Sequence, residues 1–275
     1  MQIDRNRGLT AFEQYVSPYD ITDEKIRLKV DHTYRVADIC AQIAESISLS
    51  QEDIDLAWLM GLLHDVGRFE QVRRFQTFMD AESVDHAEYG ADILFSKACD
   101  ELQEDAFTRI HPPKRIRDYV ENKEEDELIE KAIRNHNKFE IEEGLTVREI
   151  QFCNILRDAD KVDILKVNVE SPIEEIYNQS IDEFKHSMVT KEVMENFLTT
   201  EGTVLKNLKK TAIDHVVGHI SLVFGMIYKK SLELTKEQGF LEQLLQFPTE
   251  NEATKKQFKQ LQEKMHAYMQ NKLRQ

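Results

Sequence analysis

The pair His64–Asp65 stands at the end of a stretch that is apolar almost all round, which predicts a buried helix with two polar side chains at its end. His64 follows Met60 by four residues and Ala57 by seven, so its imidazole shares an inward face with them. Burying a carboxylate or an imidazole without a partner is costly. Metal coordination removes that cost, because both groups are ordinary ligands of Fe, Mn, Co, Ni and Zn.

Other potential ligands repeat this placement. His32, His136 and Asp160 each lie four residues after an apolar residue and share its helical face. His86 falls in the first turn of a further predicted helix. Periodicity does not separate Asp160 from Asp158, which shares a face with apolar residues of the same helix. The joint pattern, more than any one residue, indicates a metal site.

Helices are the elements expected to position these side chains, because no segment alternates apolar and polar residues as a strand does. The chain holds only 9 Gly and 5 Pro, so long helices with short links are expected. Helices are expected to begin after Thr22, Ser50 and Ser83, and residues 66–82 to form a loop with at most one helical turn. The other predicted helices cover 114–122, 124–136, 146–168, 173–179, 190–198, 204–235, 237–246 and 251–272.

The composition is that of a globular protein, with 41% hydrophobic and 32% charged residues among 275. The net charge of −15 argues against duplex nucleic acid and anionic membranes as partners, although a metal or a few Arg and Lys can still bind small phosphates. Cys40, Cys99 and Cys153 are widely spaced and odd in number, so no disulfide framework is expected. With neither a signal-like apolar start nor a bilayer-spanning run, we expect a cytoplasmic protein.

The order of these residues resembles a known family. His32, then His64–Asp65, then Asp160 is similar to the pattern of the HD-domain superfamily of metal-dependent phosphohydrolases. The local strings agree, GLLHDVGR around the pair and RDADKVD around the last aspartate. The resemblance covers residues from about 24 to 168.

The resemblance implies an all-α fold of the HD-domain type, a helical bundle with additional C-terminal helices. Its metal-binding core would cover 1–168, and a C-terminal helical extension, 169–275, would pack on the core as one structural domain. Family members place the ligand aspartate directly before a basic residue. This favours Asp160, which precedes Lys161, and leaves Asp158 as the alternative.

Binuclear members of the superfamily, which include the HD-GYP phosphodiesterases and the mixed-valent di-iron oxygenases, carry additional histidines between the pair and the last aspartate. His86 and His136 match that arrangement. The resemblance implies one or two divalent transition metal ions, with Asp65 bridging them, His86 and His136 on the second, and the remaining ligands His32, His64 and Asp160 on the first. The GYP signature is absent, so a cyclic-dinucleotide specificity is not expected.

The implied activity is hydrolysis of a phosphate ester of a nucleotide or another small phosphorylated metabolite by a metal-activated hydroxide. Asp65, Arg68 and Lys161 are the expected catalytic residues, the two cations stabilising charge that gathers on the phosphoryl oxygens. Arg68 and Lys161, with Arg73 and Arg74 of the following segment, are also expected to contact the substrate phosphate. Surface charge explains Arg73 and Arg74 about as well.

Two other functions fit the same residues: a mixed-valent di-iron oxygenase, and a non-catalytic regulatory module that keeps the metal centre. Most superfamily members hydrolyse phosphates, which favours hydrolysis. His215 and His219 are spaced i, i+4 on a helix that also carries Val216 and Ile220, so core packing explains them better than a substrate pocket. The C-terminal helices are a candidate homodimer surface.

Overall fold

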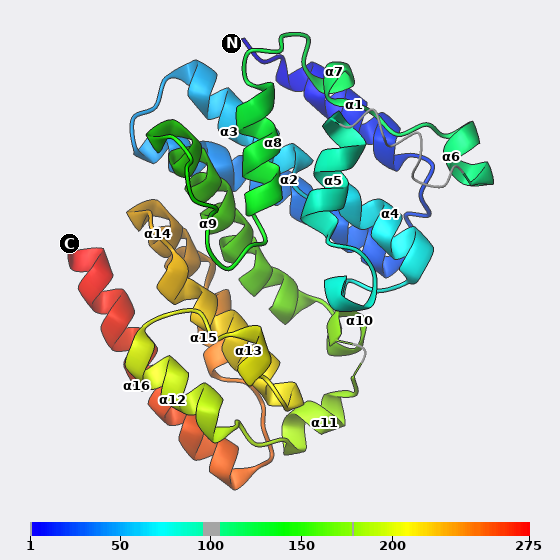
Figure 1. Cartoon of the computed structure of the whole chain (residues 1–275). Helices are drawn as coiled ribbons and strands as arrows, with labels where there is room; N and C mark the ends of the chain where they lie inside the picture. The colour runs from blue at the N-terminus through cyan, green and yellow to red at the C-terminus, as the bar shows by residue number, and fades with distance from the viewer. Residues whose placement is uncertain (1, 96–104, 178) are drawn as a thin grey trace. The chain divides into compact units, whose positions relative to one another are not determined.

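Helices form every long element of this chain, for which a computed structural model describes residues 2–95, 105–177 and 179–275 (Figure 1). No strand occurs in these residues, so the all-α prediction is confirmed. The chain divides into two compact units, Met1–Asp160 and Lys161–Gln275. The division falls within one long helix, α9 (Val147–Glu170), near the boundary at 168 expected from sequence. The packing of the extension on the core stays a prediction.

The first unit holds all the predicted metal ligands. Its elements are α1 (Arg5–Val16), α2 (Glu24–Ser46), α3 (Gln51–Leu63), α4 (Val66–Phe75), the 3-10 turn η1 (Asp80–Glu82), α5 (His86–Phe95), α6 (Ala106–Ile110), α7 (Ile116–Tyr119), α8 (Asp126–Asn135) and the first part of α9. Its core includes the fully buried rings of Phe12, Phe69 and Phe152.

The close packing of α2 and α3 brings two ligand-bearing segments together. Ser50 caps α3 as expected, because its side chain accepts a hydrogen bond from the Asp53 backbone N–H. Gly61 lies against α2 so closely that an added Cβ would come within 2.6 Å of the Ala37 Cα atom. Only glycine permits this approach, which sets the end of α3 beside the face of α2 that carries His32.

The loop predicted over 66–82 is wrong for its first ten residues, which form the helix α4. Val66, Phe69 and Val72 recur every three residues and are buried, which is the inward stripe of a helix. Charged and polar residues between them hide that period in the sequence.

Gly67 allows α4 to lie directly on α5. A Cβ at this position would collide with the backbone carbonyl of His86 and would stand 2.7 Å from the Gly90 nitrogen. The contact therefore couples the helix that follows the His64–Asp65 pair to the helix that begins with His86.

Two helices begin later than predicted from Thr22 and Ser83. Asp85, two residues beyond Ser83, accepts hydrogen bonds from the backbone N–H groups of the first turn of α5, which begins at His86. Asp23 caps α2 in place of Thr22. In both cases a carboxylate nearer the helix is the acceptor, as the positive end of the helix dipole favours.

The second unit is also helical. Its elements are the rest of α9, α10 (Ile173–Tyr177), α11 (Ile181–His186), α12 (Lys191–Thr200), η3 (Lys206–Leu208), α13 (Ala212–Ile220), η4 (Ser221–Gly225), α14 (Lys229–Gln238), α15 (Phe240–Leu245) and α16 (Glu252–Arg274). The single helix predicted over 204–235 is wrong. The Ser221 hydroxyl donates to the Gly218 carbonyl and accepts from the Val204 N–H, and the chain there tightens into η4 before turning extended at Met226.

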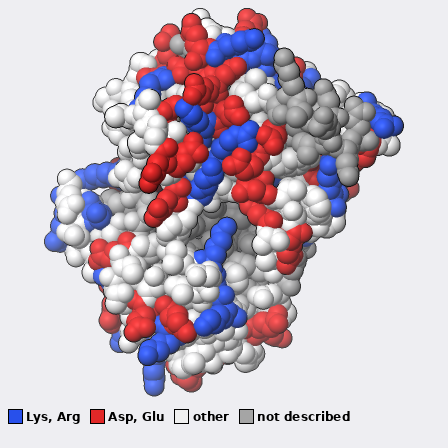
Figure 2. Space-filling model, viewed as in Figure 1, with Lys and Arg blue, Asp and Glu red and all other residues white. Residues whose placement is uncertain are grey.

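Acidic and basic side chains alternate over α5 and α8 on the face that Figure 2 shows. Arg134 is central to this pattern, since its guanidinium pairs with Glu88, Asp92 and Glu130. The charges on this face therefore form a paired network rather than a patch of one sign.

Two of the three cysteines fall in the described residues. Cys40 and Cys153 are free thiols and both are buried, while Cys99 lies outside the described residues. None of the described helices combines the length and the apolar character that a bilayer crossing needs.

Candidate metal centre

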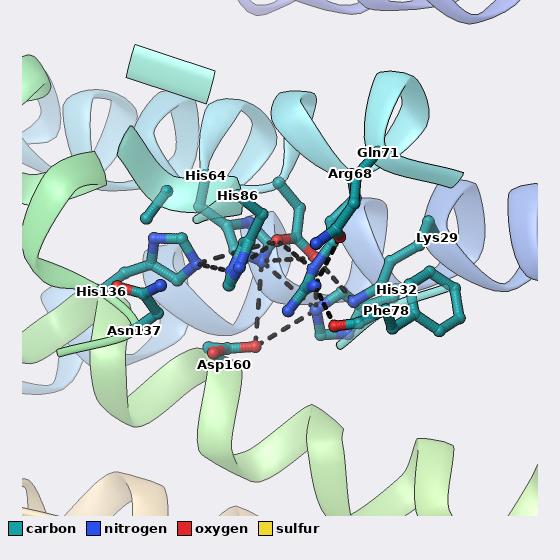
Figure 3. Close-up of polar contacts among 12 residues, drawn as sticks. Lys29, His32, His64, Arg68, Gln71, Phe78, His86, His136, Asn137 and Asp160 are labelled. Atoms are coloured by element: carbon teal, nitrogen blue, oxygen red, sulfur yellow. Dashed lines mark hydrogen bonds and ion pairs between the residues drawn. The ribbon is translucent and has the colours of Figure 1, made fainter. Parts of the chain in front are cut away.

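The structure brings together all six side chains that the sequence marks as metal ligands (Figure 3). They are His32 of α2, His64 at the C-cap of α3, Asp65 at the N-cap of α4, His86 at the start of α5, His136 at the C-cap of α8 and Asp160 of α9. The first five are 0–5% exposed, and the Asp160 side chain is 15% exposed. Because six different helices supply these groups, the site depends on the packing of the whole first unit.

One carboxylate oxygen of Asp65 faces the first group of ligand atoms. Its Oδ2 lies 3.5 Å from both His32 Nε2 and His64 Nε2, which are 3.3 Å apart. Asp160 Oδ1 lies 3.2 Å from His32 Nε2 and 3.8 Å from His64 Nε2. Donor atoms bound to one such metal ion are separated by roughly 3–3.5 Å. The four side chains therefore have the spacing of a single ligand set.

The other oxygen of Asp65 faces a second group. Its Oδ1 lies 3.5 Å from His86 Nε2 and 3.7 Å from His136 Nε2, and these two nitrogens are 3.0 Å apart. A single carboxylate thus presents one oxygen to each pair of histidines. This is the arrangement of a carboxylate that bridges two ions.

The tautomers of three histidines test whether the site fits a cation. The Nδ1 atoms of His64 and His136 each lie 2.7 Å from the backbone carbonyl three residues earlier, so both must donate there. His86 Nδ1 lies 2.7 Å from Asp80 Oδ2 and donates to that carboxylate. In the neutral rings every Nε2 then carries a lone pair, and these lone pairs converge on one another and on Asp65. Such a cluster is repulsive by itself and becomes favourable around a cation.

The electrostatics keep these groups in the forms that bind metals. Burial lowers the pKa of His64 to about 4 and that of His86 to about 3, so both rings are neutral at pH 7. Burial alone would raise the pKa of Asp65, but the Lys29 ammonium and the surrounding imidazoles outweigh it and hold that pKa well below its usual range. The pKa of Asp160 is likewise lowered by the neighbouring imidazoles against the effect of burial.

Of the two aspartates that periodicity left open, Asp160 directs its carboxylate at His32 and His64. Asp158 is fully buried on the same helix and belongs to none of the metal-binding groups found among the described residues. The geometry therefore selects Asp160 as the member of the cluster.

Sequence reasoning missed Lys29. Its Nζ lies 2.7 Å from Asp65 Oδ2 and 5.4 Å from the centre of the Phe78 ring, and its side chain is only 13% exposed (Figure 3). The signal was available, because Lys29 precedes His32 by three residues and thus shares its face of α2.

Sequence reasoning also missed Asp80, which orients His86. Besides accepting from His86 Nδ1, its Oδ1 accepts from Gln71 Nε2 at 2.9 Å and lies 3.0 Å from Arg68 Nη1. A carboxylate that receives the second ring N–H of a ligating histidine fixes the tautomer and raises ligand basicity. Asp80 lies in the turn η1, where no periodic pattern marks it.

Arg68 lies beside the cluster, as expected. Its Nε is 3.7 Å from Asp65 Oδ1 and, although buried, has no hydrogen-bond partner among the described residues. Its Nη1 donates to the backbone carbonyl of Phe78 and to Gln71 Oε1, both at 2.7 Å. These bonds hold the guanidinium in place and leave Nε directed at the site.

The other predicted phosphate-binding cations have partners of their own. Arg73 and Arg74 both bond the buried carboxylate of Glu70, at 2.6 and 2.8 Å. Lys161 Nζ donates to the backbone carbonyl of Gly225 at 2.6 Å, within the second unit. None of these three contacts involves the ligand cluster, so their substrate role stays a prediction that the proposal below does not use.

Comparison with known proteins gives one match. Residues 30–165 match the family model described as the HD domain. The matched segment contains all six predicted ligands. No curated protein and no solved structure matches the chain.

Proposed function

Because the chain belongs to the HD-domain superfamily through residues 30–165, we propose that it is a metal-dependent phosphohydrolase acting on a nucleotide or another small phosphorylated metabolite. The observation that carries this proposal is the position of the Asp65 carboxylate. Its two oxygens each face a separate pair of histidine Nε2 atoms. We therefore assign Asp65 as the bridging ligand of a two-ion centre.

The ligands divide into two sets under this proposal. His32, His64 and Asp160 would hold the first ion, and His86 and His136 the second. When bound, two divalent ions supply Lewis acidity toward the phosphoryl group and a hydroxide nucleophile at neutral pH.

The protein's own contribution is to hold the ligands rigidly and to place cations beside them. The Lys29 ammonium and the Arg68 guanidinium carbon lie 5.4 and 5.8 Å from the centre of the Phe78 ring, and both side chains lie close to Asp65. Negative charge grows on the phosphoryl oxygens as the transition state forms, so fixed cations lower the barrier. This pair of cations favours a phosphate substrate over dioxygen, which carries no charge to bind.

A phosphatase assay with matched variants tests the proposal. Protein loaded with Mn²⁺, Fe²⁺ or Co²⁺ should hydrolyse members of a panel of phosphomonoesters, phosphodiesters and nucleotides. Asp65→Ala should lower kcat/KM at least about 100-fold. Asp38→Ala, on an exposed face of α2, should leave it unchanged.

Each of three results would contradict the proposed hydrolysis, and two of them would identify another function. Metal-loaded protein that turns over no member of the panel would contradict hydrolysis. Oxygen consumption with a mixed-valent di-iron signal would instead show the oxygenase. Saturable binding of a phosphorylated ligand without any turnover would show a regulatory module.

A further inference from the structure

Gln71 is a buried amide beside the metal centre to which the proposed hydrolysis gives no role. It lies on α4, three residues after Arg68, and its side chain is fully buried (Figure 3). A glutamine amide carries two N–H donors and a carbonyl oxygen, and burying any of them unpaired is costly. The groups that the amide bonds therefore indicate what it positions.

The partners on each side fix the direction of the amide. Arg68 Nη1 can only donate, so the amide atom 2.7 Å from it is Gln71 Oε1. The Val84 carbonyl can only accept, so the amide atom 3.0 Å from it is Gln71 Nε2. Nε2 also lies 2.9 Å from Asp80 Oδ1 and 2.8 Å from Ser83 Oγ. One amide thus accepts from α4 and donates to the segment that leads from η1 to α5.

This segment is bonded on both sides of Asp80. The backbone carbonyl of Phe78, two residues earlier, accepts from Arg68 Nη1 at 2.7 Å. Because Gln71 bonds the backbone on the other side, residues 78–84 are held against α4 at both ends. The second oxygen of Asp80 accepts from the ligand histidine at the start of α5. The position of this segment therefore sets the orientation of a ligand of the second ion.

Gln71 also separates the charges of Arg68 and Asp80. Arg68 Nη1 carries two protons, and its acceptors at 2.7 Å are Gln71 Oε1 and the Phe78 carbonyl. Asp80 Oδ1 is farther away, at 3.0 Å, and accepts from Gln71 Nε2 instead. Without the amide, the freed guanidinium N–H would turn to this carboxylate, since charge-assisted hydrogen bonds are the stronger ones. The Arg68 Nε that faces Asp65 would then be drawn away from the site.

We propose that Gln71 is a positioning residue that keeps Arg68 directed at the metal centre and keeps Asp80 on His86. A neutral amide suits this role, because it donates to the carboxylate and accepts from the guanidinium without adding charge beside the ions. The effect of Gln71 on turnover rests on the proposed hydrolysis, whereas its effect on the two neighbouring side chains does not.

Gln71→Met tests the role, because methionine is unbranched and adaptable and can fill the same buried space without bonding either partner. In a calorimetric metal titration, we expect the second ion to bind about tenfold more weakly and the first ion to bind as in wild type. A crystal structure of the metal-stripped variant should show Arg68 paired with Asp80, and its Nε farther from Asp65 Oδ1 than 3.7 Å. Gln14→Met, at an exposed position of α1, is the control and should change neither result.

The conservative variant Gln71→Asn decides the question if Gln71→Met does not fold. It keeps a polar amide whose reach is one methylene shorter, so it cannot bond both sides, and it should show the same loss of second-ion affinity. With both sites saturated by metal, kcat/KM should also fall about tenfold in each variant.

Neither the metal affinities nor the crystal structure needs turnover. If wild type hydrolyses no substrate, the proposed hydrolysis fails, and these two measurements still decide the role of Gln71. Wild-type affinity for the second ion, an equal loss of affinity for both ions, or an Arg68 side chain that stays in place in Gln71→Met would each overturn the proposal.

Discussion

His86 and His136 face each other through ring nitrogens that both carry lone pairs. Their Nε2 atoms are 3.0 Å apart, and in the neutral rings, whose protons are on Nδ1, no proton lies between them. The Nδ1 proton of His86 is donated to Asp80, and that of His136 to the Ile133 carbonyl. A contact of this kind is stable when a cation lies against both nitrogens, and Asp65 Oδ1 lies close to both.

The Asp80 carboxylate should therefore control the second ion. We expect Asp80→Asn to weaken binding of that ion about 10- to 100-fold, because the amide removes the negative charge and replaces one acceptor oxygen beside His86 Nδ1 by an N–H donor. Metal titration followed by calorimetry would resolve the two affinities. Glu82→Gln, at an exposed position of the same turn, serves as the control. If both metal affinities of Asp80→Asn equal those of wild type, Asp80 does not orient His86.

Lys29 should increase the rate of substrate turnover without binding the metal ions. We expect Lys29→Met to lower kcat/KM about 100-fold, because the substrate phosphate loses a cation held in place beside Asp65. Lys29→Arg should recover part of the activity, since it restores the charge with different geometry. Metal content, measured in parallel, should stay at the wild-type value in both variants. Wild-type kcat/KM in Lys29→Met would exclude a role in catalysis.

The packing of α4 on α5 should be sensitive to a single methyl group. Gly67→Ala should lower the free energy of unfolding by about 1–3 kcal/mol, because its Cβ would collide with backbone atoms of α5. Gly202→Ala is the matched control, since its nearest contact would be a side chain 3.4 Å away. Urea denaturation monitored by circular dichroism measures both variants. Equal stability of the two would show that the helices pack less closely than described.

The stability of the metal-free protein should fall as the pH drops. The pKa of His64 moves from an ordinary 6.5 to about 4 in the folded chain, and that of His86 to about 3. Above pH 6.5 neither state binds these protons; below it the unfolded chain takes them up first, so the free energy of unfolding decreases down to about pH 3. The lowered pKa values of Asp65 and Asp160 act in the same direction at the acid end.

Urea denaturation of chelator-treated protein between pH 7.5 and pH 4.5 would measure this dependence. We expect a loss of a few kcal/mol, on the order of 1.4 kcal/mol for each unit of pKa difference at one histidine. A free energy of unfolding that is constant or rises over this interval would contradict the neutral, buried state of His64 and His86.

The ligands could be predicted from sequence because each stands on an inward face, where a polar side chain needs a partner. His32 and His64 show this, since the period of their helices alone places them among buried residues. The partners that orient the ligands could not be found in this way. Asp80 lies in a short turn without periodicity, and Lys29 has the sequence appearance of a surface lysine.

The helices, like the site residues, include some that the sequence predicts well and some that it does not. Long helices with a clear stripe, such as α16, are predicted to within two residues of their ends. In α4, by contrast, Glu70 and Gln71 are buried polar residues. Glu70 accepts a hydrogen bond from Tyr19, far away in the sequence, and Gln71 donates to Asp80 of the turn η1. Because a buried polar residue interrupts the apolar period, the inward face of α4 cannot be predicted from the local sequence pattern. Arg73 and Arg74, which look free in sequence, lie three and four residues after Glu70 and pair with it because the segment is helical.

Metal stoichiometry tests the central claim most directly, since the two oxygens of Asp65 are assigned to two different ions. Protein purified without oxygen should be analysed by elemental mass spectrometry alongside His136→Ala. We expect two transition metal ions per wild-type chain and one per variant chain, because the variant loses a ligand of the second ion only. One ion per wild-type chain, with the same content in His136→Ala, would contradict the two-ion centre.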